Sequence, residues 1–338
     1  MSKRHRPEQG SASRPAAAGR SARPRRAASA ERAAPPATPR RRLVVASAIG
    51  ALIIGAGVVY LVQDPDGPAT VSAGSAKSLP PVEFETGVVH VHGLGVDPAD
   101  GALYAATHSG LFRLPTSGAA VRVANRAQDT MGFSIVGPRT FIGSGHPDFR
   151  EDDVRPPLLG LIESTDAGQS WTRLSLHGKA DFHALHAAHG QVYGYDSTSQ
   201  TFMVSKDRTA WERRAQLPMR DFAISPTEPD TVLATTERGL ARSTDGGKTF
   251  QTVGGPPGLV VLAWAEKGSL YGSAFDGSVH RSADGGITWS RRGTAAGEPE
   301  AIAVDDRNGS ETVYVAVAER GILASADGAQ TFTTRYKE

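Results

Sequence analysis

The sequence predicts an all-β protein, a six-bladed β-propeller, preceded by one transmembrane helix and a disordered basic N-terminal tail. Three observations lead to this prediction: a motif that recurs every 38 to 43 residues, strand-like runs on either side of each copy, and one long uncharged stretch near the start. A fixed period of this size is typical of repeat architectures such as propellers. The 338 residues suffice for one large β domain with appendages.

Residues 1–42 are expected to form a disordered cytoplasmic tail. This segment holds 12 of the 37 Lys and Arg residues but only two of the 35 Asp and Glu residues, and it shows no apolar periodicity. Such a composition cannot bury enough apolar surface to fold. The rest of the chain is acidic, so no nucleic-acid partner is expected for the propeller.

Residues 43–62, LVVASAIGALIIGAGVVYLV, are predicted to form the transmembrane helix. Twenty uncharged residues can cross the hydrocarbon core, and Arg40, Arg41 and Arg42 just before them favour a cytoplasmic N-terminus. The expected location is therefore the cell membrane, with a single pass and the propeller outside. A cleaved signal peptide is the alternative, but its apolar region is usually only about 7–15 residues long. Residues 63–81 are expected to form a flexible stalk and 82–338 the propeller.

The chain contains no cysteine. This excludes disulfides, thiolate nucleophiles and cysteine-based zinc or iron–sulfur sites. Any metal in this protein must therefore be held by nitrogen, oxygen or thioether ligands.

The repeated motif has the form S-x-D-x-G-x-[TS]-[WF]. Copies begin at Ser164, Ser243, Ser282 and Ser325, and a degenerate copy begins at Ser205. The Asp side chain can accept hydrogen bonds from its own turn, Gly supplies a positive φ, and the aromatic residue packs onto the sheet. A structural role is therefore expected for the five aspartates, Asp166, Asp207, Asp245, Asp284 and Asp327.

This motif resembles the Asp-box (BNR) repeat of sialidase-like propellers, which implies a turn between the third and fourth strands of each blade. The spacing then divides residues 88–334 into six blades, with a seventh if the two ends build more. The ends are expected to close the ring together. The predicted blades span 88–123, 129–174, 181–214, 220–252, 259–291 and 300–334.

The stretch FRLP, from Phe112 to Pro115, resembles the arginine motif of sialidases. Aligned with the other repeats, however, Arg113 matches Arg242 on a third strand, whereas the sialidase motif opens an inner strand. A typical sialidase site is therefore not expected. A two-carboxylate glycosidase remains an alternative; its candidate carboxylates are Asp148, Asp153, Glu163 and Asp196.

Histidines are concentrated where blades one to three begin. The repeats align His92, Met131 and His183 at the start of three inner strands, while His108 and His146 end the strands that follow. His90 precedes His92 by two residues and so points to the same side of the strand. All are expected on one face of the disc, opposite the motif turns, with Asp148, Tyr195 and Asp196 nearby as possible ligand-lining residues.

Imidazoles suit copper and zinc, and a thioether favours copper. We therefore expect a transition-metal site at this face, copper or zinc, formed by His90, His92, His108, His146, His183 and Met131. A polar lining for a glycan or other organic ligand and a purely structural role are the alternatives.

HVHGLGVDPADGALYAATHSGLFR, GSGHPD and LGLIESTDAGQSW together resemble a group of membrane-anchored propellers of actinobacterial type, loosely labelled glycosylhydrolase or exo-α-sialidase. Three functions follow as hypotheses: a metal-binding module, a glycosidase or metal-assisted hydrolase, and a protein-interaction scaffold for a cell-envelope partner.

Overall fold

The computed structural model describes residues 87–151, 155–307 and 309–337. The predicted tail, transmembrane helix and stalk lie outside these residues. No helix among the residues described is long and apolar enough to cross a membrane. The predicted carboxylate Asp153 also lies outside them.

The described chain forms six four-stranded antiparallel sheets, and in each sheet four consecutive strands pair in chain order. This confirms the six-bladed propeller, and no seventh sheet is present among the described residues. The predicted blade limits agree with the observed strands within three residues. The first three blades comprise β1 (Val91–Val96), β2 (Leu103–Thr107), β3 (Gly110–Leu114), β4 (Val121–Arg122), β5 (Asp129–Gly137), β6 (Thr140–His146), β7 (Leu161–Ser164), β8 (Thr172–Ser175), β9 (Phe182–Ala188), β10 (Gln191–Asp196), β11 (Thr201–Ser205) and β12 (Glu212–Gln216), with a short 3-10 turn, η1 (Val123–Asn125), after β4.

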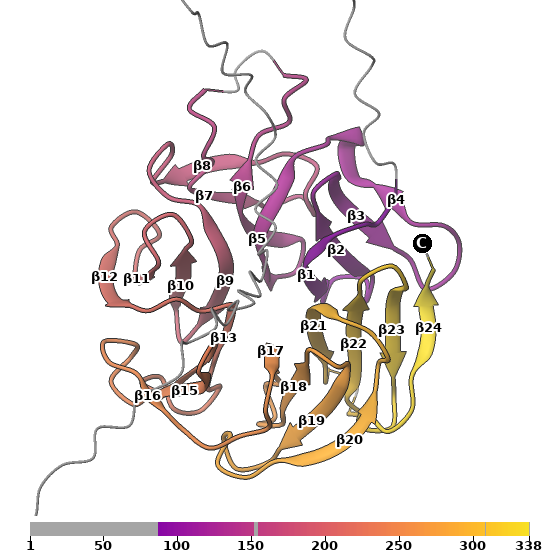
Figure 1. Ribbon diagram of the computed structural model, residues 1–338. Coiled ribbons are helices and arrows are strands. Elements are labelled where there is room, and N and C mark those ends of the chain that lie inside the picture. The colour runs from indigo at the N-terminus through magenta and orange to yellow at the C-terminus, as the bar shows by residue number, and fades with distance from the viewer. Residues whose placement is uncertain (1–86, 152–154, 308, 338) are drawn as a thin grey trace, which may run out of the picture. The chain divides into compact units, whose positions relative to one another are not determined.

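Blades four to six follow the same plan. The inner strands of all six blades surround the centre of the ring, as Figure 1 shows. Strands three and four of each blade lie toward the rim. The last three blades comprise β13 (Asp221–Ile224), β14 (Val232–Thr236), β15 (Gly239–Ser243), β16 (Gln251–Thr252), β17 (Leu259–Trp264), β18 (Leu270–Ala274), β19 (Ser278–Ser282), β20 (Ser290–Thr294), β21 (Pro299–Asp305), β22 (Thr312–Val317), β23 (Gly321–Ser325) and β24 (Thr333–Tyr336).

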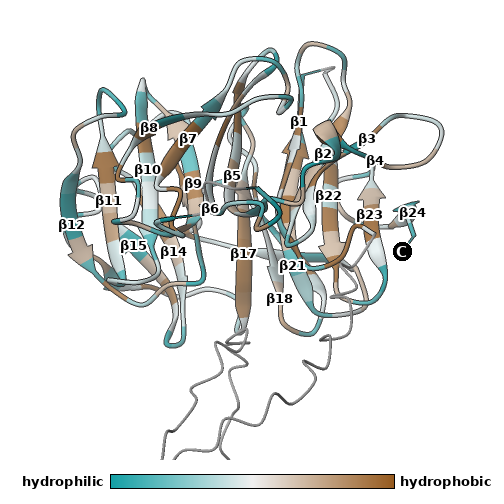
Figure 2. Cartoon of the chain, turned by 90° about the horizontal axis from the view of Figure 1, so that it is seen from above, coloured by the Kyte–Doolittle hydropathy of each residue, from teal (hydrophilic) through white to brown (hydrophobic). Residues whose placement is uncertain are grey.

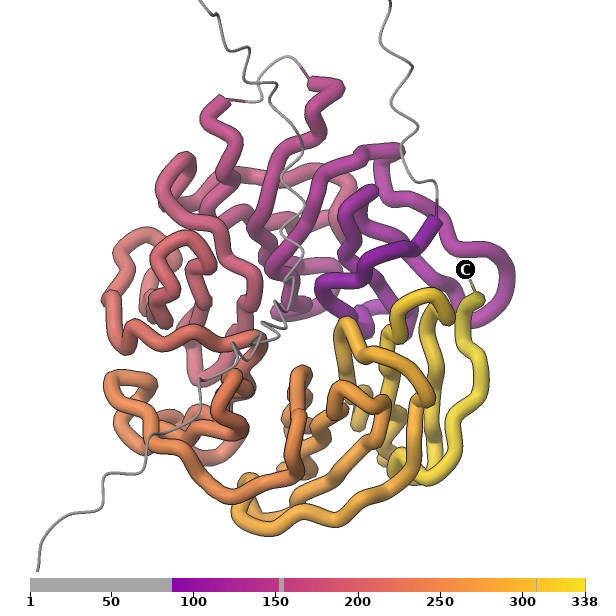
Figure 3. The backbone as a smooth tube through the Cα atoms, viewed as in Figure 1, coloured from indigo at the N-terminus to yellow at the C-terminus, as the bar shows by residue number. Residues whose placement is uncertain are grey.

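The hydrophobic core consists of six layers, one between each pair of neighbouring blades. Apolar residues run along the strands and hydrophilic residues collect at the turns (Figure 2). One layer joins Ala301, Ala316 and Ile322 of blade six to Leu103 and Phe112 of blade one. The backbone trace in Figure 3 shows these blades side by side. The ring is therefore closed by burial of apolar surface between the last and first blades.

The motif turns connect strands three and four of blades two to six, as predicted. In the turn from Ser243, the Ser hydroxyl donates to Oδ1 of Asp245 at 2.7 Å and accepts the N–H of Gly247 at 2.8 Å. Asp245 in turn accepts the N–H of Lys248 and the N–H and hydroxyl of Thr249. The same Ser-to-Asp bond recurs at Asp166, Asp284 and Asp327, and a longer one of 3.4 Å is found at Asp207.

Candidate metal site

The inner strands of blades one, two and three carry a β-bulge near their first residues. The bulge falls at His92 in β1, at Met131 and Gly132 in β5, and at His183 in β9. A bulge inserts an extra residue and redirects its side chain, and bulges are frequent beside functional sites. The three residues therefore occupy equivalent positions around the ring, which is the register that the repeats predicted.

Strand pairing brings the second set of histidines to the same end of the sheet. Asp129, the first residue of β5, pairs with His146, the last residue of β6. Val91 pairs with Thr107, so His108 follows directly beside the start of β1. The motif turns lie at the other end of the blades, because strand three runs parallel to strand one. We call the histidine-bearing face of the ring the mouth.

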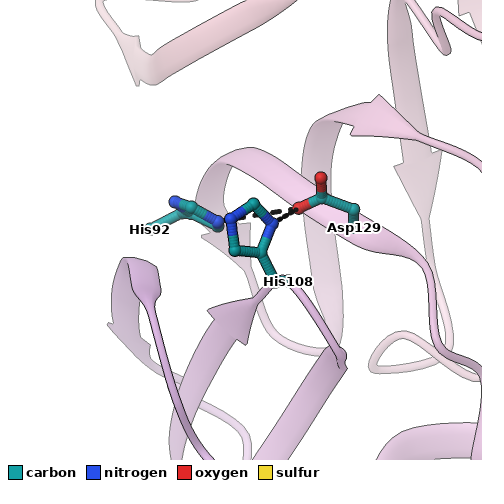
Figure 4. A group of neighbouring side chains, drawn as sticks. All are labelled: His92, His108 and Asp129. Atoms are coloured by element: carbon teal, nitrogen blue, oxygen red, sulfur yellow. Dashed lines mark ion pairs between the residues drawn. The ribbon is translucent and has the colours of Figure 1, made fainter. Parts of the chain in front are cut away.

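The central group at the mouth consists of His92, His108 and Asp129 (Figure 4). Each presents a ligand atom, and these atoms lie within 4.8 Å of one another. Nδ1 of His108 lies 2.9 Å from Oδ1 of Asp129, and Nε2 of His92 lies 3.6 Å from the same oxygen. The His92 and His108 rings meet edge to face, with centroids 4.5 Å apart. Blades one and two thus form this group jointly.

His92 is a neutral base at physiological pH. Burial, with a further contribution from the neighbouring His108, lowers the pKa of its imidazole to about 3. Its Nε2 is buried and has no hydrogen-bond partner among the described residues. An unpaired buried nitrogen is costly to desolvate, and a neutral imidazole is the form that binds metals.

Asp129 is the anion of the group. Burial raises the pKa of its carboxyl, but the contacts with His108 and His146 outweigh burial and hold the pKa well below its usual range. Nδ1 of His146 lies 3.2 Å from Oδ2 of Asp129, and this hydrogen bond raises the pKa of His146. The carboxylate therefore has histidines at both oxygens.

The remaining two histidines of the predicted set lie at the edges of the mouth. His90 has a left-handed backbone, with φ of 51°, and its Nδ1 lies 3.8 Å from Oε1 of Glu300 in blade six. Its ring also contacts that of His108, with centroids 5.6 Å apart. Nε2 of His183 lies 2.9 Å from Oδ2 of Asp181, just before β9.

The other predicted residues have different surroundings. Met131 takes the bulge position in β5, and its backbone lies against Gly145. Asp148 is buried and forms hydrogen bonds with the N–H of Ala127 and with Arg150, so it anchors the loop after β6.

Tyr195 and Asp196 also differ from the prediction. Tyr195 is buried in the core layer between blades three and four, so its ring does not line the mouth. Asp196 pairs with Phe182 in the ladder, so Ser197, not Asp196, takes the position equivalent to His108 and His146. The buried Asp196 side chain accepts the N–H of Asp181 at 3.0 Å. The prediction was one residue out because it matched the ends of the strand-like runs, whereas the backbone pairs Ser197 with Asp181, whose carbonyl accepts the Ser197 N–H at 2.9 Å.

Glu163 and Arg113 lie on third strands. Glu163 forms an ion pair with Arg208, and Arg113 lies on β3 and forms an ion pair with Asp100 at 2.7 Å. The strand position of Arg113 agrees with the repeat alignment.

Asp129, Asp181 and Glu300 are not among the site residues predicted from the sequence. A positional signal was available: Asp129 and Asp181 precede the bulge residues Met131 and His183 by two, as His90 precedes His92. Glu300 takes the bulge position of blade six.

No protein-family model matches the chain. The chain is 26% identical over 221 residues to a protein of Neosartorya fischeri named probable oligoxyloglucan-reducing end-specific xyloglucanase. The alignment covers 53% of this chain and 27% of that protein, so the chain spans about a quarter of the relative's length.

Solved structures with similar folds include an ancestral GH74 enzyme, with a TM-score of 0.47, 13% identity and coverage of 73% of this chain and 38% of that chain. The GH74 xyloglucanase from Xanthomonas campestris has a TM-score of 0.47 and 15% identity, with coverage of 72% and 45%. YCF48 bound to D1 peptide has a TM-score of 0.40 and 16% identity, with coverage of 61% and 66%. These similarities are distant, and the strand pairing itself establishes the six-bladed ring.

Proposed function

We propose that this protein is a membrane-anchored, extracytoplasmic propeller that binds a transition-metal ion, copper or zinc, at the mouth of its ring of blades. The observation that carries the proposal is the convergence of His92, His108 and Asp129 within 4.8 Å. The buried, unpaired Nε2 of His92 supports it, because a ligand at this atom removes the cost of leaving it unpaired.

The spacing of the ligand atoms suits a metal ion. In a tetrahedral zinc site with bonds of about 2.0–2.2 Å, neighbouring ligand atoms lie roughly 3.4 Å apart. The two nitrogen-to-oxygen distances to Asp129, 2.9 and 3.6 Å, lie on either side of this value. Two imidazoles and a carboxylate form a harder ligand set than one containing the Met131 thioether, and this favours zinc over copper.

Three protein ligands leave the fourth position of a tetrahedral ion open. The His108 side chain is 49% exposed, so one of the three ligand residues is accessible to solvent. An open position suits reversible metal exchange in sequestration, delivery or sensing, and also suits a metal-assisted hydrolase. The placement outside the cell rests on the uncharged segment 43–62 and the arginines before it.

Titration of the purified, tag-free full-length protein with zinc and with copper tests this proposal. We expect the His92→Ala/His108→Ala double variant to lose at least tenfold in affinity for the preferred metal. His280→Ala, a histidine on the third strand of blade five, is the matched control and should bind as the wild type does. Absence of binding by the wild type, or equal binding by the double variant, would contradict the proposal.

A second candidate is a glycoside hydrolase, favoured by the sequence similarity to the Neosartorya fischeri protein. Asp129 and Asp181 are acidic side chains at the mouth that such a reaction can use. Incubation with xyloglucan oligosaccharides, with and without a chelator, tests it. Release of reducing ends that is abolished in Asp129→Asn and Asp181→Asn variants supports it, and no release excludes this substrate class.

We also propose that the motif turns belong to the Asp-box type. Their Ser–Asp hydrogen bonds and positive-φ glycines support this assignment. In this role the aspartates stabilise turns at the end of the ring opposite the mouth, where they do not contact the metal.

A further inference from the structure

His146 contacts Asp129 from outside the central group. Its Nδ1 lies 3.2 Å from Oδ2 of the carboxylate, whereas His108 and His92 approach the other oxygen, Oδ1, at 2.9 and 3.6 Å. Among the described residues, the ligand atoms that converge are those of His92, His108 and Asp129, and His146 is not a member of this group. The carboxylate therefore turns one oxygen toward the proposed ion and the other toward a single histidine.

The hydrogen bond between His146 and Asp129 has a fixed direction when a metal is bound. A carboxylate that binds a metal is deprotonated, so its oxygens can only accept hydrogen bonds. Nδ1 of His146 must then carry a proton and donate it to Oδ2. A ring nitrogen that carries a proton has no lone pair to offer a metal, so through this atom His146 holds the carboxylate and not the ion.

The backbone on either side of His146 fixes it against the start of β5. His146 and Asp129 pair in the ladder, and the preceding residue, Gly145, has a φ of 126°. A Cβ on Gly145 would overlap the carbonyl oxygen of Asp129, so this close approach requires glycine. Two residues after His146, the buried Asp148 accepts the N–H of Ala127 at 2.8 Å. The chain is thus tied to the segment that opens β5 on both sides of the histidine.

We propose that His146 is a positioning residue of the metal site: its Nδ1–H donates to Oδ2 and holds the Asp129 carboxylate so that only Oδ1 faces the two ligand histidines. This inference rests on the proposed metal-binding function and deepens it, because it takes His146 out of the ligand set predicted from the sequence and makes Asp129 a ligand through one oxygen. Hydrogen-bond partners of this kind orient metal ligands, and their loss typically lowers metal affinity about 10–100-fold. The His146 side chain is 28% exposed, so water is partly excluded from this hydrogen bond.

Zinc affinity and the number of bound imidazoles together distinguish a positioning residue from a ligand. In isothermal titration calorimetry of the tag-free full-length protein, we expect His146→Ala to bind zinc about tenfold or more weakly than the wild type, with the stoichiometry unchanged. X-ray absorption fine structure at the zinc edge should give two imidazoles per zinc in both proteins. His146→Asn keeps an N–H donor close to the position of Nδ1, so its affinity should return to within about threefold of the wild type.

The matched control is His186→Ala, because His186 lies on β9 and approaches Asp221 of blade four at 3.9 Å; it should bind zinc as the wild type does. Three imidazoles in the wild type, one of them lost in His146→Ala, would make His146 a ligand and overturn the positioning role. Equal affinity in His146→Ala and the wild type, or no recovery in His146→Asn, would also overturn it. These three results leave the proposed metal-binding function standing, whereas a wild type that binds no zinc would overturn both.

Discussion

Nδ1 of His108, just after the second strand of blade one, lies 2.9 Å from Oδ1 of Asp129, at the start of blade two. Neither blade contains this pair alone, so the docking of two blades creates it. The core layer that holds these blades together, which includes Tyr104, Phe133 and Phe141, therefore also positions the mouth.

The identity of the third ligand is testable by comparing Asp129 with Met131. We expect Asp129→Asn to lower zinc affinity at least tenfold, because it removes the negative ligand between the histidines. Met131→Leu should stay within twofold of the wild type, because the ligand set consists of two imidazoles and a carboxylate. Isothermal titration calorimetry measures both. A larger loss in Met131→Leu than in Asp129→Asn would assign the thioether instead.

Gly247 tests how a motif turn packs on the preceding blade. A Cβ at this position would lie 2.2 Å from Cε1 of Phe202, a fully buried ring of blade three, and the backbone φ is 85°. We expect Gly247→Ala to lower the free energy of unfolding by about 1–3 kcal/mol.

The control for this prediction is Gly254→Ala, where a Cβ meets no atom within 4 Å. Thermal unfolding followed by near-UV circular dichroism compares the two variants. Equal melting temperatures would show that the turn tolerates a side chain.

Asp245 tests the hydrogen bonds within the same turn. Its carboxylate accepts bonds from the Ser243 hydroxyl and from Lys248 and Thr249. We expect Asp245→Ala to destabilise the propeller by about 1 kcal/mol, because backbone donors lose their acceptor. Thr244→Ala, at an exposed position of the same turn, is the control. The denaturant concentration at the midpoint of unfolding measures the stability of both variants. An unchanged midpoint in Asp245→Ala would refute the structural role of Asp245.

The turns also predict a pH dependence of stability. Hydrogen bonds from the backbone of Ala210 and Thr209 lower the pKa of Asp207 to about 2, and bonds from Thr288 do the same for Asp284. A carboxyl whose pKa is lower in the folded state stabilises the fold above its unfolded pKa of about 3.9, and that contribution is lost as the pH falls through the folded pKa.

Stability should therefore fall between about pH 4 and pH 2. The Asp207→Asn/Asp284→Asn double variant should show a shallower fall, because two titrating groups are gone. Unfolding midpoints measured across this range test the prediction, and identical slopes in the two proteins would contradict it.

Much of the fold was predictable from the sequence because the motif recurs once per blade. The aspartates marked the third-to-fourth strand turns, and aligning the repeats placed His92, Met131 and His183 in one register. A β-bulge at each of these three residues confirms that they occupy equivalent positions in their strands.

The site was less predictable, because its contacts cross between blades. The approach of His108 to Asp129 depends on how two blades are tilted against each other, and no repeat spacing encodes that tilt. Strand pairing beyond the apparent strand end also limited the prediction: Ser197, whose N–H bonds to the carbonyl of Asp181, lies where Asp196 was expected. The acidic partners of the histidines, Asp129 and Asp181, emerged only when side chains were placed in space.

The central claim is that His92, His108 and Asp129 together bind a metal ion. Anomalous diffraction at the zinc absorption edge, from crystals of the protein grown with zinc, tests it most directly. The account predicts a peak at the mouth within about 2.0–2.2 Å of His92 Nε2, His108 Nδ1 and Asp129 Oδ1. A map with no peak at the mouth, or with peaks only elsewhere on the protein, would contradict it.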